Sequence, residues 1–347
     1  MHFGKEEGDL ILSITAKDLA KKLNLSEAAI SMALHNKPGV SNKTRKRVIE
    51  AAEKYGYDFS RISTSETIQK EHGTIALMIY KRHGAVVTDT PFFSQLSEGI
   101  SLGCKLNQYS LNIQYIYPSS SIDALIKNIE VNGMRGIILL GTEMQESDFL
   151  PFQKYRIPIV LLDTYFDKIP TDCIQINNNQ GAYLAVSHLI SKYHMQPGYL
   201  RSSYRIHNFD ERADGFYKAI RENGMSTSAS VVHRLSPSVE GSYADMKELL
   251  QQGEKVARCY FADNDLIAAG AMKAFKESGY KIPDDISIIG FDDMPVCTYL
   301  EPSLSTVQVP KQYMGELAAQ KLISLIEGHN ELAVKIEVSV RLIIRKS

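Results

Sequence analysis

The sequence predicts two kinds of structure in one chain: a small all-α segment with a helix-turn-helix pattern, then an α/β core of two Rossmann-like subdomains. Three observations support this prediction. Residues 13–57 place apolar positions at helical spacing between capping residues. From residue 73 onward, apolar strands alternate with helices, and the alternation forms two successive series. Repeated strand–helix–strand units form parallel sheets that are covered on both faces.

The first two predicted helices carry capping signals at their starts. Thr15 and Asp18 have the spacing of a capping box, in which each side chain accepts a hydrogen bond from the other residue's amide. The apolar stripe of this helix consists of Leu19, Ala20 and Leu23. Residues 24–25 form a tight turn, and Ser26 is a favourable N-cap for a second helix over 27–34. Two helices joined by so short a turn match the helix-turn-helix pattern.

A third helix is predicted over residues 42–55, with Ser41 as its N-cap. Residues 15–57 contain nine Lys or Arg and four Asp or Glu, a charge of +5, whereas the whole chain has a charge of −1. A local basic surplus on an acidic remainder is typical of a segment that binds phosphate groups. The alternative interpretation is an ordinary helical bundle with a solvated charged face.

The predicted elements of the core follow from the alternation of apolar runs and amphipathic stretches. Strands are expected at 74–80, 110–117, 136–141, 157–163, 173–177, 198–202, 231–235, 258–263, 286–291 and near 336–344. Helices are expected at 93–107, 121–131, 180–193, 212–224, 243–252, 265–279 and 312–327. Because Pro197 has no amide to donate, we expect the strand after it to start late or to lie at a sheet edge.

Composition and motifs exclude several classes of protein. No apolar run approaches the roughly 18 residues that span a bilayer, and the first residues lack the apolar stretch of a signal peptide. The cysteines, at positions 104, 173, 259 and 297, form no CxxC pair, so we expect a reduced, cytoplasmic protein without a metal site. No Gly-rich phosphate loop, HExxH or GxSxG motif is present, so we expect neither an enzyme nor a cofactor.

Residues 15–57 resemble, without a gap, the DNA-binding headpiece of the lac-repressor/gal-repressor family. The match includes Thr15-Ala-Lys-Asp18-Leu-Ala, Ser26-Glu-Ala-Ala-Ile-Ser31 and Asn36-Lys-Pro38-Gly-Val-Ser41-Asn-Lys-Thr44. The resemblance implies that a set of hydroxyl and amide side chains lies near DNA phosphates, namely Thr15, Ser26, Ser31, Asn36, Ser41 and Thr44. It also implies that Glu27, Ala28 and Met32 point at base edges.

The sequence departs from the family pattern at two places that concern DNA. The family commonly has Arg where Met32 stands, and Met cannot donate a hydrogen bond to guanine. We therefore expect an operator that differs from the common half-site at this position. In the hinge, Glu66 stands where the family places a leucine that wedges into the minor groove, and burying a carboxylate there is costly. Either Ile62 or Ile68 takes the wedge position, or the hinge does not intercalate.

The core resembles the effector-binding core of the same family, which has the element order of a periplasmic sugar-binding protein. The resemblance marks a set of residues at strand ends and helix starts as effector contacts: Asp89, Phe92, Phe93, Asp163, Arg212, Asn264 and Asp292. Carboxylates and amides suit vicinal hydroxyls, and an aromatic face covers the C–H side of a sugar ring. Asp210 adds a carboxylate, which favours a neutral sugar over a phosphorylated one. Alternatively, such aspartates act only as helix caps.

The resemblance also implies a domain plan. It consists of a flexible lead-in at 1–12, the headpiece at 13–57, a hinge or linker at 58–72, and a core for effector binding and dimerisation at 73–347. Within the core, the first subdomain takes residues 73–175 and 306–328, and the second takes 176–305 and 329–347.

The function predicted from these features is that of a sequence-specific DNA-binding transcriptional regulator, a repressor whose operator affinity is controlled by a small ligand. A homodimer is expected, because one headpiece recognises one half-site of a pseudo-palindromic operator. The alternatives are a solute-binding module of transport or chemotaxis, a regulator that responds to a nucleobase, and an enzyme that acts on sugars.

Overall fold

The computed structural model describes residues 14–34, 39–59, 72–87, 90–329 and 332–347. The chain divides into two compact units, residues 1–70 and residues 71–347, and each is described by itself. Several predicted positions lie outside the described residues, and their roles stay predictions: the lead-in 1–12, Asn36, Ile62, Glu66, Ile68 and Asp89.

The headpiece is a bundle of three helices, α1 (Ala16–Leu23), α2 (Glu27–Leu34) and α3 (Asn42–Lys54). Their apolar faces meet in a small buried core made of Leu19, Ala20, Ile30, Ala33, Val48, Ala51 and Ala52. The capping box of Thr15 and Asp18 is present at the start of α1, as predicted. The predicted helix-turn-helix pattern is therefore confirmed.

Two arginines of α3 join the three headpiece helices. Arg47 donates to the carbonyl of Leu23 at the end of α1, with a distance of 3.2 Å. Arg45 donates to the carbonyls of Met32 and Ala33 at the end of α2, at 3.1 and 3.3 Å. The last carbonyls of a helix have no partner within it, so side-chain donors stabilise them. Part of the basic surplus of the headpiece thus serves its fold.

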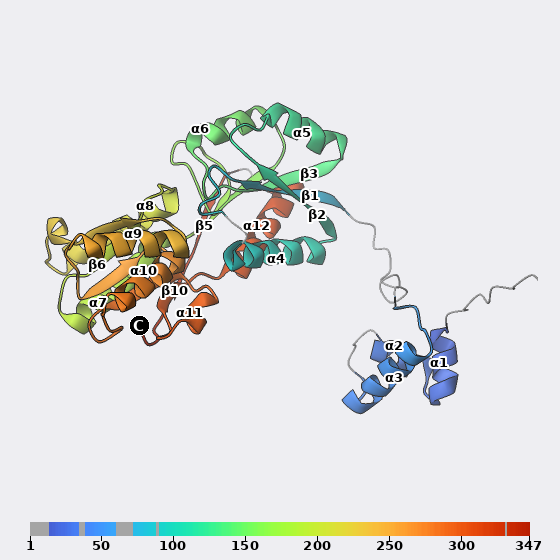
Figure 1. Cartoon of the computed structure of the whole chain (residues 1–347). Helices are drawn as coiled ribbons and strands as arrows, with labels where there is room; N and C mark the ends of the chain where they lie inside the picture. Colours follow the sequence, from blue (N-terminus) through green and yellow to red (C-terminus); the bar gives the residue numbers. More distant parts are fainter. Residues whose placement is uncertain (1–13, 35–38, 60–71, 88–89, 330–331) are drawn as a thin grey trace, which may run out of the picture. The chain divides into compact units, whose positions relative to one another are not determined.

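The first subdomain of the core is a parallel six-stranded sheet covered by helices on both faces (Figure 1). In spatial order its strands are β11 (Lys335–Val338), β5 (Cys173–Ile176), β4 (Ile159–Leu162), β3 (Met134–Leu140), β1 (Gly73–Tyr80) and β2 (Tyr109–Ile116). Its helices are α4 (Pro91–Leu106), α5 (Ile122–Val131), α6 (Glu146–Phe149), the short 3-10 helix η2 (Leu150–Lys154) and α12 (Lys311–Ile326). Side chains alternate along β1, so that Ile75, Leu77 and Ile79 share a cluster with α4 and α12.

The second subdomain contains another six-stranded sheet, in which β12 alone is antiparallel to its neighbour. In spatial order its strands are β12 (Arg341–Ile343), β10 (Ser305–Gln308), β9 (Ser287–Asp292), β8 (Cys259–Ala262), β6 (Gly198–Ser202) and β7 (Val232–Leu235). Its helices are α7 (Asn178–Tyr193), α8 (His207–Glu222), η3 (Thr227–Ala229), α9 (Val239–Gln251), α10 (Asp265–Glu277) and α11 (Val296–Tyr299). The predicted two-sheet α/β fold is confirmed. Strand β6 does begin just after Pro197, but it lies inside the sheet and not at its edge.

The expected limits of the two subdomains are wrong in two places. Strand β10 pairs with β9, so residues 305–308 belong to the second subdomain, and the crossing to the first follows β10. Strand β11 pairs with β5, so residues 335–338 belong to the first subdomain and not to the second. Only two residues separate β11 from β12. In the sequence, these two strands of different sheets therefore resemble a single continuous strand. The chain therefore crosses between the subdomains three times.

Helix α8 begins at His207, five residues before the predicted start at 212. Its N-cap is Ile206, which makes no side-chain capping bond, so the sequence carries no capping signal at this start. This earlier start places Asn208 and Arg212 on consecutive turns of one helix. Among the described residues, no helix is long and apolar enough to cross a membrane.

Candidate functional site

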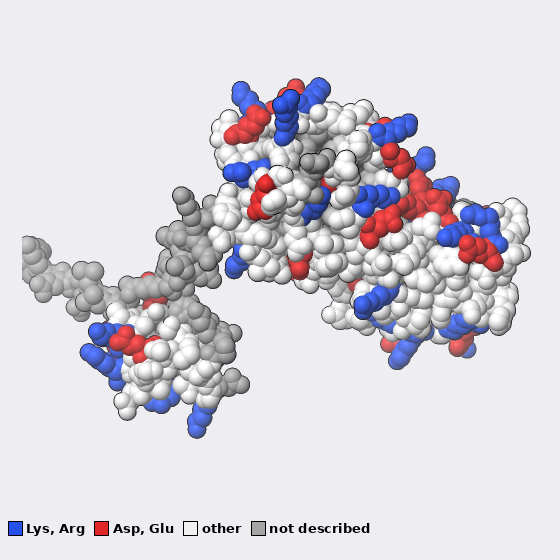
Figure 2. All heavy atoms as spheres, turned by 180° about the vertical axis from the view of Figure 1, so that it is seen from behind, with Lys and Arg blue, Asp and Glu red and all other residues white. Residues whose placement is uncertain are grey.

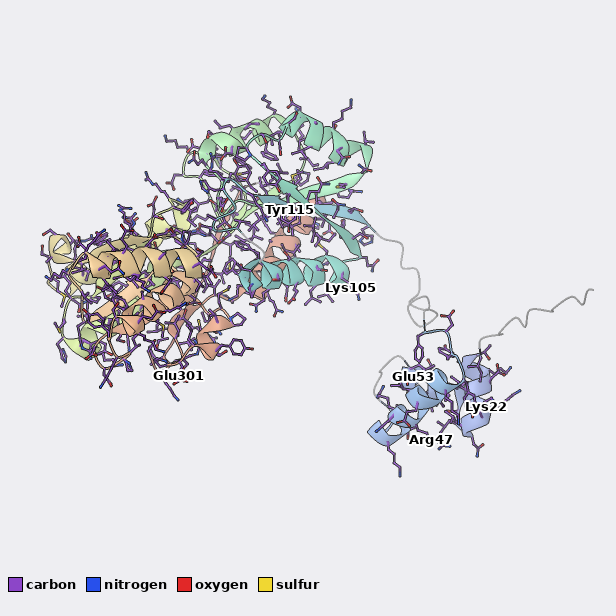
Figure 3. The ribbon with its side chains drawn as sticks, in the orientation of Figure 1. Lys22, Arg47, Glu53, Lys105, Tyr115 and Glu301 are labelled. Carbon is purple, nitrogen blue, oxygen red and sulfur yellow. The ribbon has the colours of Figure 1, made fainter. Side chains whose placement is uncertain are left out.

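The second helix of the headpiece presents an exposed face. Glu27, Ala28 and Ser31 are exposed on α2, whereas Ile30 and Ala33 are buried beneath them. In Figure 2, most of the charged side chains visible on the headpiece are Lys or Arg. Figure 3 shows Lys22 and Arg47 on α1 and α3. The headpiece therefore combines an exposed helix face with a basic surface, the composition of a DNA-binding unit.

Met32 differs from the other predicted base contacts because it is half-buried. Gly39 has a φ of +118°, and a Cβ at this position would lie 2.7 Å from the Met32 sulfur. The Met32 side chain therefore packs directly on the backbone of Gly39. Its contact with a base remains a prediction, and its packing against Gly39 is a structural role that the sequence did not indicate.

Three of the predicted phosphate contacts, Thr15, Ser26 and Ser41, act as helix caps. Ser26 accepts from the amide of Ala29 at 3.1 Å, and Ser41 accepts from the amide of Thr44 at 3.2 Å. The Thr15 hydroxyl donates to Asp18, and this hydrogen bond lowers the pKa of Asp18. These hydroxyls lie at helix starts, where a phosphate can also approach backbone amides. Their contact with DNA stays a prediction.

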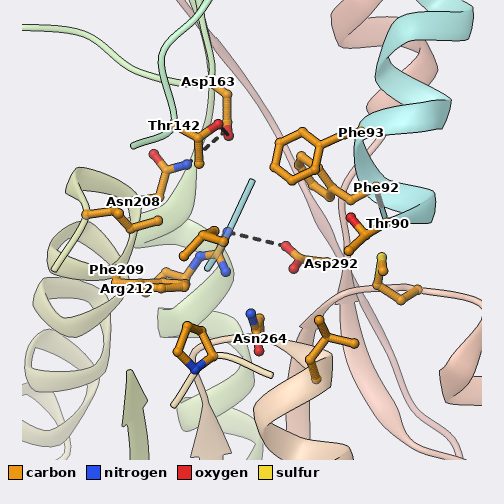
Figure 4. A pocket seen from close by; sticks show the side chains of 15 residues that line it. Thr90, Phe92, Phe93, Thr142, Asp163, Asn208, Phe209, Arg212, Asn264 and Asp292 are labelled. Atoms are coloured by element: carbon orange, nitrogen blue, oxygen red, sulfur yellow. Dashed lines mark hydrogen bonds and ion pairs between the residues drawn. The ribbon is translucent and has the colours of Figure 1, made fainter. Parts of the chain in front are cut away.

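In the core, a pocket lies between the two subdomains and gathers all six described effector candidates (Figure 4). Its lining consists of Val86, Thr90, Phe92, Phe93, Thr142, Asp163, Ile206, Asn208, Phe209, Arg212, Pro237, Asn264, Leu266, Asp292 and Met294. The side chains surround about 460 Å³ of space, part of it open to solvent. We call it the effector pocket.

Asp163 is the acidic group that the first subdomain contributes. It follows β4 with a φ of +62° and is 1% exposed. Its carboxylate accepts from the Thr142 hydroxyl at 2.6 Å and from the Asn208 amide at 2.9 Å. Burial raises the pKa of Asp163 to about 6, although Thr142, Arg212 and Asn208 act in the opposite direction. The bond from Asn208 crosses the pocket and links the two subdomains.

Arg212 is the cationic group of the effector pocket, and its side chain is 4% exposed. Its Nε donates to Asn178 at 2.8 Å, one terminal nitrogen donates to the Asp263 carbonyl, and the other lies 3.3 Å from Asp292. The guanidinium also stacks over Phe291, 3.7 Å from the ring centroid. These partners hold the guanidinium in one orientation, as binding of a hydroxylated ligand requires.

Asp292 and Asn264 complete the polar side of the effector pocket. Asp292 is the last residue of β9 and has a φ of +110°, and burial raises its pKa while Arg212 and Lys311 lower it. Asn264 caps α10 by accepting from the amide of Ile267 at 2.8 Å. Asp265, which follows Asn264, accepts from the Met294 amide and the Thr306 hydroxyl and has a structural role.

Sequence reasoning missed three polar residues of the effector pocket, Thr90, Thr142 and Asn208. Thr142 lies two residues beyond the end of β3, next to Asp163. Asn208 lies four residues before Arg212 on α8, a spacing that places both side chains on one face of a helix. Its side-chain oxygen is buried and has no hydrogen-bond partner among the residues that the structure describes. Buried acceptors are normally satisfied, so this atom points to a donor on a bound ligand.

Glu143 fixes the wall of the effector pocket through an arrangement that the sequence did not indicate. Its buried carboxylate accepts from five successive or nearly successive backbone amides at 2.7–3.1 Å, those of Arg82, His83, Gly84, Val86 and Val87. Burial opposes ionisation of Glu143, but these hydrogen bonds outweigh it and lower its pKa. Because Val86 lines the pocket, Glu143 positions one of its walls.

Asp210 does not have the effect expected from the sequence. It pairs with Arg201 at 3.0 Å and with Arg205 at 2.9 Å, and it lines a neighbouring cavity and not the effector pocket. Its charge is compensated by these two guanidinium groups. The expectation that Asp210 disfavours an anionic ligand in the effector pocket is therefore wrong.

Comparison with known proteins places these features in a family. Residues 15–59 match the model of bacterial regulatory proteins of the lacI family, and residues 186–347 match a periplasmic binding protein-like domain. The chain is 31% identical over 343 residues to the probable HTH-type transcriptional repressor ExuR of Bacillus subtilis, covering 96% of this chain and 98% of that protein. The chain belongs to the LacI family. Its named relatives are transcriptional regulators and not enzymes, which confirms that prediction.

Solved structures of LacI-family proteins share the fold over both units of the chain. A lac repressor dimer bound to its operator and the anti-inducer ONPF has a TM-score of 0.69 at 22% identity and covers 96% of this chain and 99% of its own. A LacI family transcriptional regulator from Enterococcus faecium with bound ribose has a TM-score of 0.68 at 26% identity, with coverages of 79% and 98%. This LacI-family chain is thus a transcriptional repressor with a DNA-binding and a ligand-binding domain.

Proposed function

We propose that this chain represses transcription as a cytoplasmic homodimer whose operator affinity is set by a neutral sugar in the effector pocket. The residues that line the effector pocket are the observation that supports a sugar as the ligand. Asp163, Asp292 and Asn208 supply acceptors, Arg212 supplies donors, and Phe92 and Phe93 supply apolar faces. Sugars combine vicinal hydroxyl groups with an apolar C–H face, so both kinds of group are needed. The E. faecium relative with bound ribose supports this class of ligand.

The charges of the lining support a neutral ligand. Two carboxylates, Asp163 and Asp292, face the pocket together with the single guanidinium of Arg212. Arg212 already interacts with Asp292 at 3.3 Å. An anionic group in this pocket would lie near two carboxylates whose ionisation burial already opposes. Hydroxyl groups avoid that repulsion, because they donate to carboxylates and accept from Arg212.

The contact between Asn208 and Asp163 gives the ligand a way to act on the subdomains. This hydrogen bond of 2.9 Å joins α8 of the second subdomain to the end of β4 in the first. A ligand that bonds both residues replaces the direct contact and changes the preferred arrangement of the subdomains. Such a change alters operator affinity by a coupling free energy, typically about 1–3 kcal/mol.

The homodimer is supported by an exposed apolar surface on the first subdomain. Strand β2 lies at the edge of its sheet and exposes Ile113 and Tyr115, and Tyr117, directly after the strand, is also exposed. The neighbouring helix α4 exposes Leu102 and Leu106; Figure 3 shows Tyr115 on β2 and Lys105 on α4. Contiguous exposed apolar side chains commonly mark a protein–protein interface. A second copy of the chain that covers this surface would present two headpieces to a two-fold operator.

The sugar assignment is tested by a thermal-shift screen of neutral sugars and nucleobases on the full chain. We expect one neutral sugar to raise the melting temperature, and its affinity to fall by at least about tenfold in Arg212→Lys, because Lys lacks the planar fork of Arg. Arg221→Lys, at the exposed far end of α8, is the matched control and keeps wild-type affinity. A response to a nucleobase alone, or equal losses in both variants, contradicts the proposal.

A further inference from the structure

We propose that the chain has a second small-molecule site, beside the effector pocket, that binds an oxyanion such as a phosphate or carboxylate group. The site is a cavity on the second subdomain that we call the basic pocket. Its lining consists of Arg201, Ser202, Ser203, Tyr204, Arg205, Phe209, Asp210 and Arg234, which surround about 490 Å³ of space, part of it open to solvent. It shares only Phe209 with the effector pocket, so the proposal does not depend on the sugar assignment.

The sheet holds two of the arginines directly side by side. Arg201 on β6 and Arg234 on β7 are register partners in a parallel pair. Neighbouring strands are about 4.8 Å apart, and residues in register project to the same face of the sheet. Like charges directly opposite one another destabilise a sheet. Two arginines on the same face of neighbouring strands create a local need for negative charge.

The protein meets this need only in part. Asp210 is the one carboxylate among the residues that line the basic pocket, and it pairs with Arg201 and Arg205. In the described part of the chain, no carboxylate lies within ion-pair distance of Arg234. The lining thus combines three guanidinium groups with one carboxylate, a net charge of +2.

The start of α8 adds to the positive potential of the basic pocket. Phe209 and Asp210, from the first turn of this 16-residue helix, belong to the lining. The N-cap, Ile206, makes no side-chain capping bond. The first amides of a helix need acceptors, and they carry the positive end of its dipole. An oxyanion is the kind of group that such a helix start and several guanidinium forks bind together.

The chemistry of the site selects oxyanions over halide ions. Guanidinium groups present planar pairs of N–H donors that match two oxygens of a phosphate or carboxylate. Arg205 is largely exposed, at 87% of its side-chain surface, whereas Arg201 is 23% exposed. Arg201 therefore lies at the base of the basic pocket, and the exposed Arg234 and Arg205 approach a ligand from β7 and from the loop before α8.

The test is isothermal titration calorimetry, in which the full chain is titrated with inorganic phosphate at constant ionic strength in chloride buffer. We expect saturable binding at one site per chain. Arg234→Gln removes a guanidinium group that has no ion pair in the described structure. This change should weaken phosphate binding about tenfold, the effect of losing one charge-assisted hydrogen bond. Arg221→Gln removes the same charge from the far end of α8 and should change the affinity less than about twofold.

Acetate and ribose 5-phosphate, titrated in the same way, identify the anionic group and its carrier. Binding of any of these anions that weakens in Arg234→Gln supports the site. Tighter binding of ribose 5-phosphate than of phosphate shows that the anionic group belongs to a larger molecule. Equal weakening in Arg234→Gln and Arg221→Gln, or no saturable binding of any of the three anions, overturns the proposal. Binding that is lost in Arg212→Lys but retained in Arg234→Gln would place the anion in the effector pocket and overturn it as well.

Discussion

The headpiece and the effector pocket both depend on polar side chains, but they hold these side chains in opposite ways. In the headpiece, Ser26 and Ser41 are exposed and accept from an amide three residues further along the chain. In the pocket, Arg212 is buried and bonds Asn178 and Asp292, which are 34 and 80 residues away. The capping bonds of the headpiece are therefore local, whereas the bonds of the pocket exist only once the two sheets have formed.

This difference sets the order in which substitutions should matter. A cap on the surface can exchange its protein partner for water, so its loss costs little. A buried group that loses its partner leaves a donor or acceptor with neither protein nor water, and this costs the full desolvation of that group. We therefore expect the effect of a substitution to follow the burial of the group and the number of hydrogen bonds that it makes.

Glu143→Gln should have the largest effect. The carboxylate oxygens of Glu143 divide five amide donors between them, three on one and two on the other. A Gln side chain presents one oxygen and one NH₂ group, so at least two amides would face a donor. We expect the free energy of unfolding to fall by about 3 kcal/mol, as for other buried charged networks that lose one member. Urea denaturation of the full chain measures it.

Glu130→Gln is the control for this experiment, because Glu130 is exposed near the end of α5. It should leave the unfolding midpoint unchanged. Equal stabilities of Glu143→Gln and Glu130→Gln would show that the loop of residues 82–87 does not need its buried carboxylate, and the distinction between the two regions would lose its main support.

Asp163 gives the second prediction, a dependence of stability on pH. An unfolded Asp has a pKa of about 4, whereas burial raises that of the folded chain to about 6. Between these pH values Asp163 keeps its proton in the folded chain and not in the unfolded chain. The proton bound to Asp163 therefore stabilises the folded state. This contribution is complete below about pH 4 and is lost as the pH rises through 6. Relative to Asp163→Asn, the wild-type chain should lose about 2 kcal/mol between about pH 4.5 and pH 6.5.

The pH profile is measured by urea denaturation of both chains at each pH. Because the comparison uses the slope and not the absolute stability, any loss of the Thr142 and Asn208 contacts in Asp163→Asn cancels. Parallel profiles for the two chains would mean that Asp163 ionises near its ordinary value in the folded protein.

The contrast between the two regions also explains what the sequence could predict. The headpiece helices were predicted to within a residue or two, because Thr15, Ser26 and Ser41 are capping residues whose partners lie three positions away. The start of α8 could not be predicted, because Ile206 is not a capping residue. Resemblance to a family, and not spacing alone, indicated the effector candidates that the fold brings together.

Glu143 and the end of the chain show where sequence reasoning stops. The amides that Glu143 binds lie 56 to 61 positions earlier in the chain, so no local spacing marks this residue. Strands β11 and β12 are separated by two residues but belong to different sheets. Only the pairing of β11 with β5 reveals the third crossing. Both features depend on contacts between distant segments, which periodicity does not encode.

Ser41→Ala tests the local side of the comparison and should have a smaller effect. It removes the acceptor for the Thr44 amide at the exposed start of α3, and loss of an N-cap costs about 1 kcal/mol. Amide hydrogen exchange of the headpiece in the full chain measures this cost. Ser41→Asn is the matched control, because Asn is an equally good N-cap. If Ser41→Asn destabilised the headpiece as much as Ser41→Ala, the capping bond would not be the cause.

Lys46→Gln should have the smallest effect on folding. Lys46 and Glu50 form an ion pair of 3.9 Å on α3, with 81% and 64% of their side chains exposed. Such surface pairs contribute less than about 1 kcal/mol, so hydrogen exchange of the headpiece should hardly change. A loss as large as that of Ser41→Ala would break the proposed order. If this charge serves DNA and not the fold, the slope of log affinity against log salt for an operator duplex should fall by about one unit.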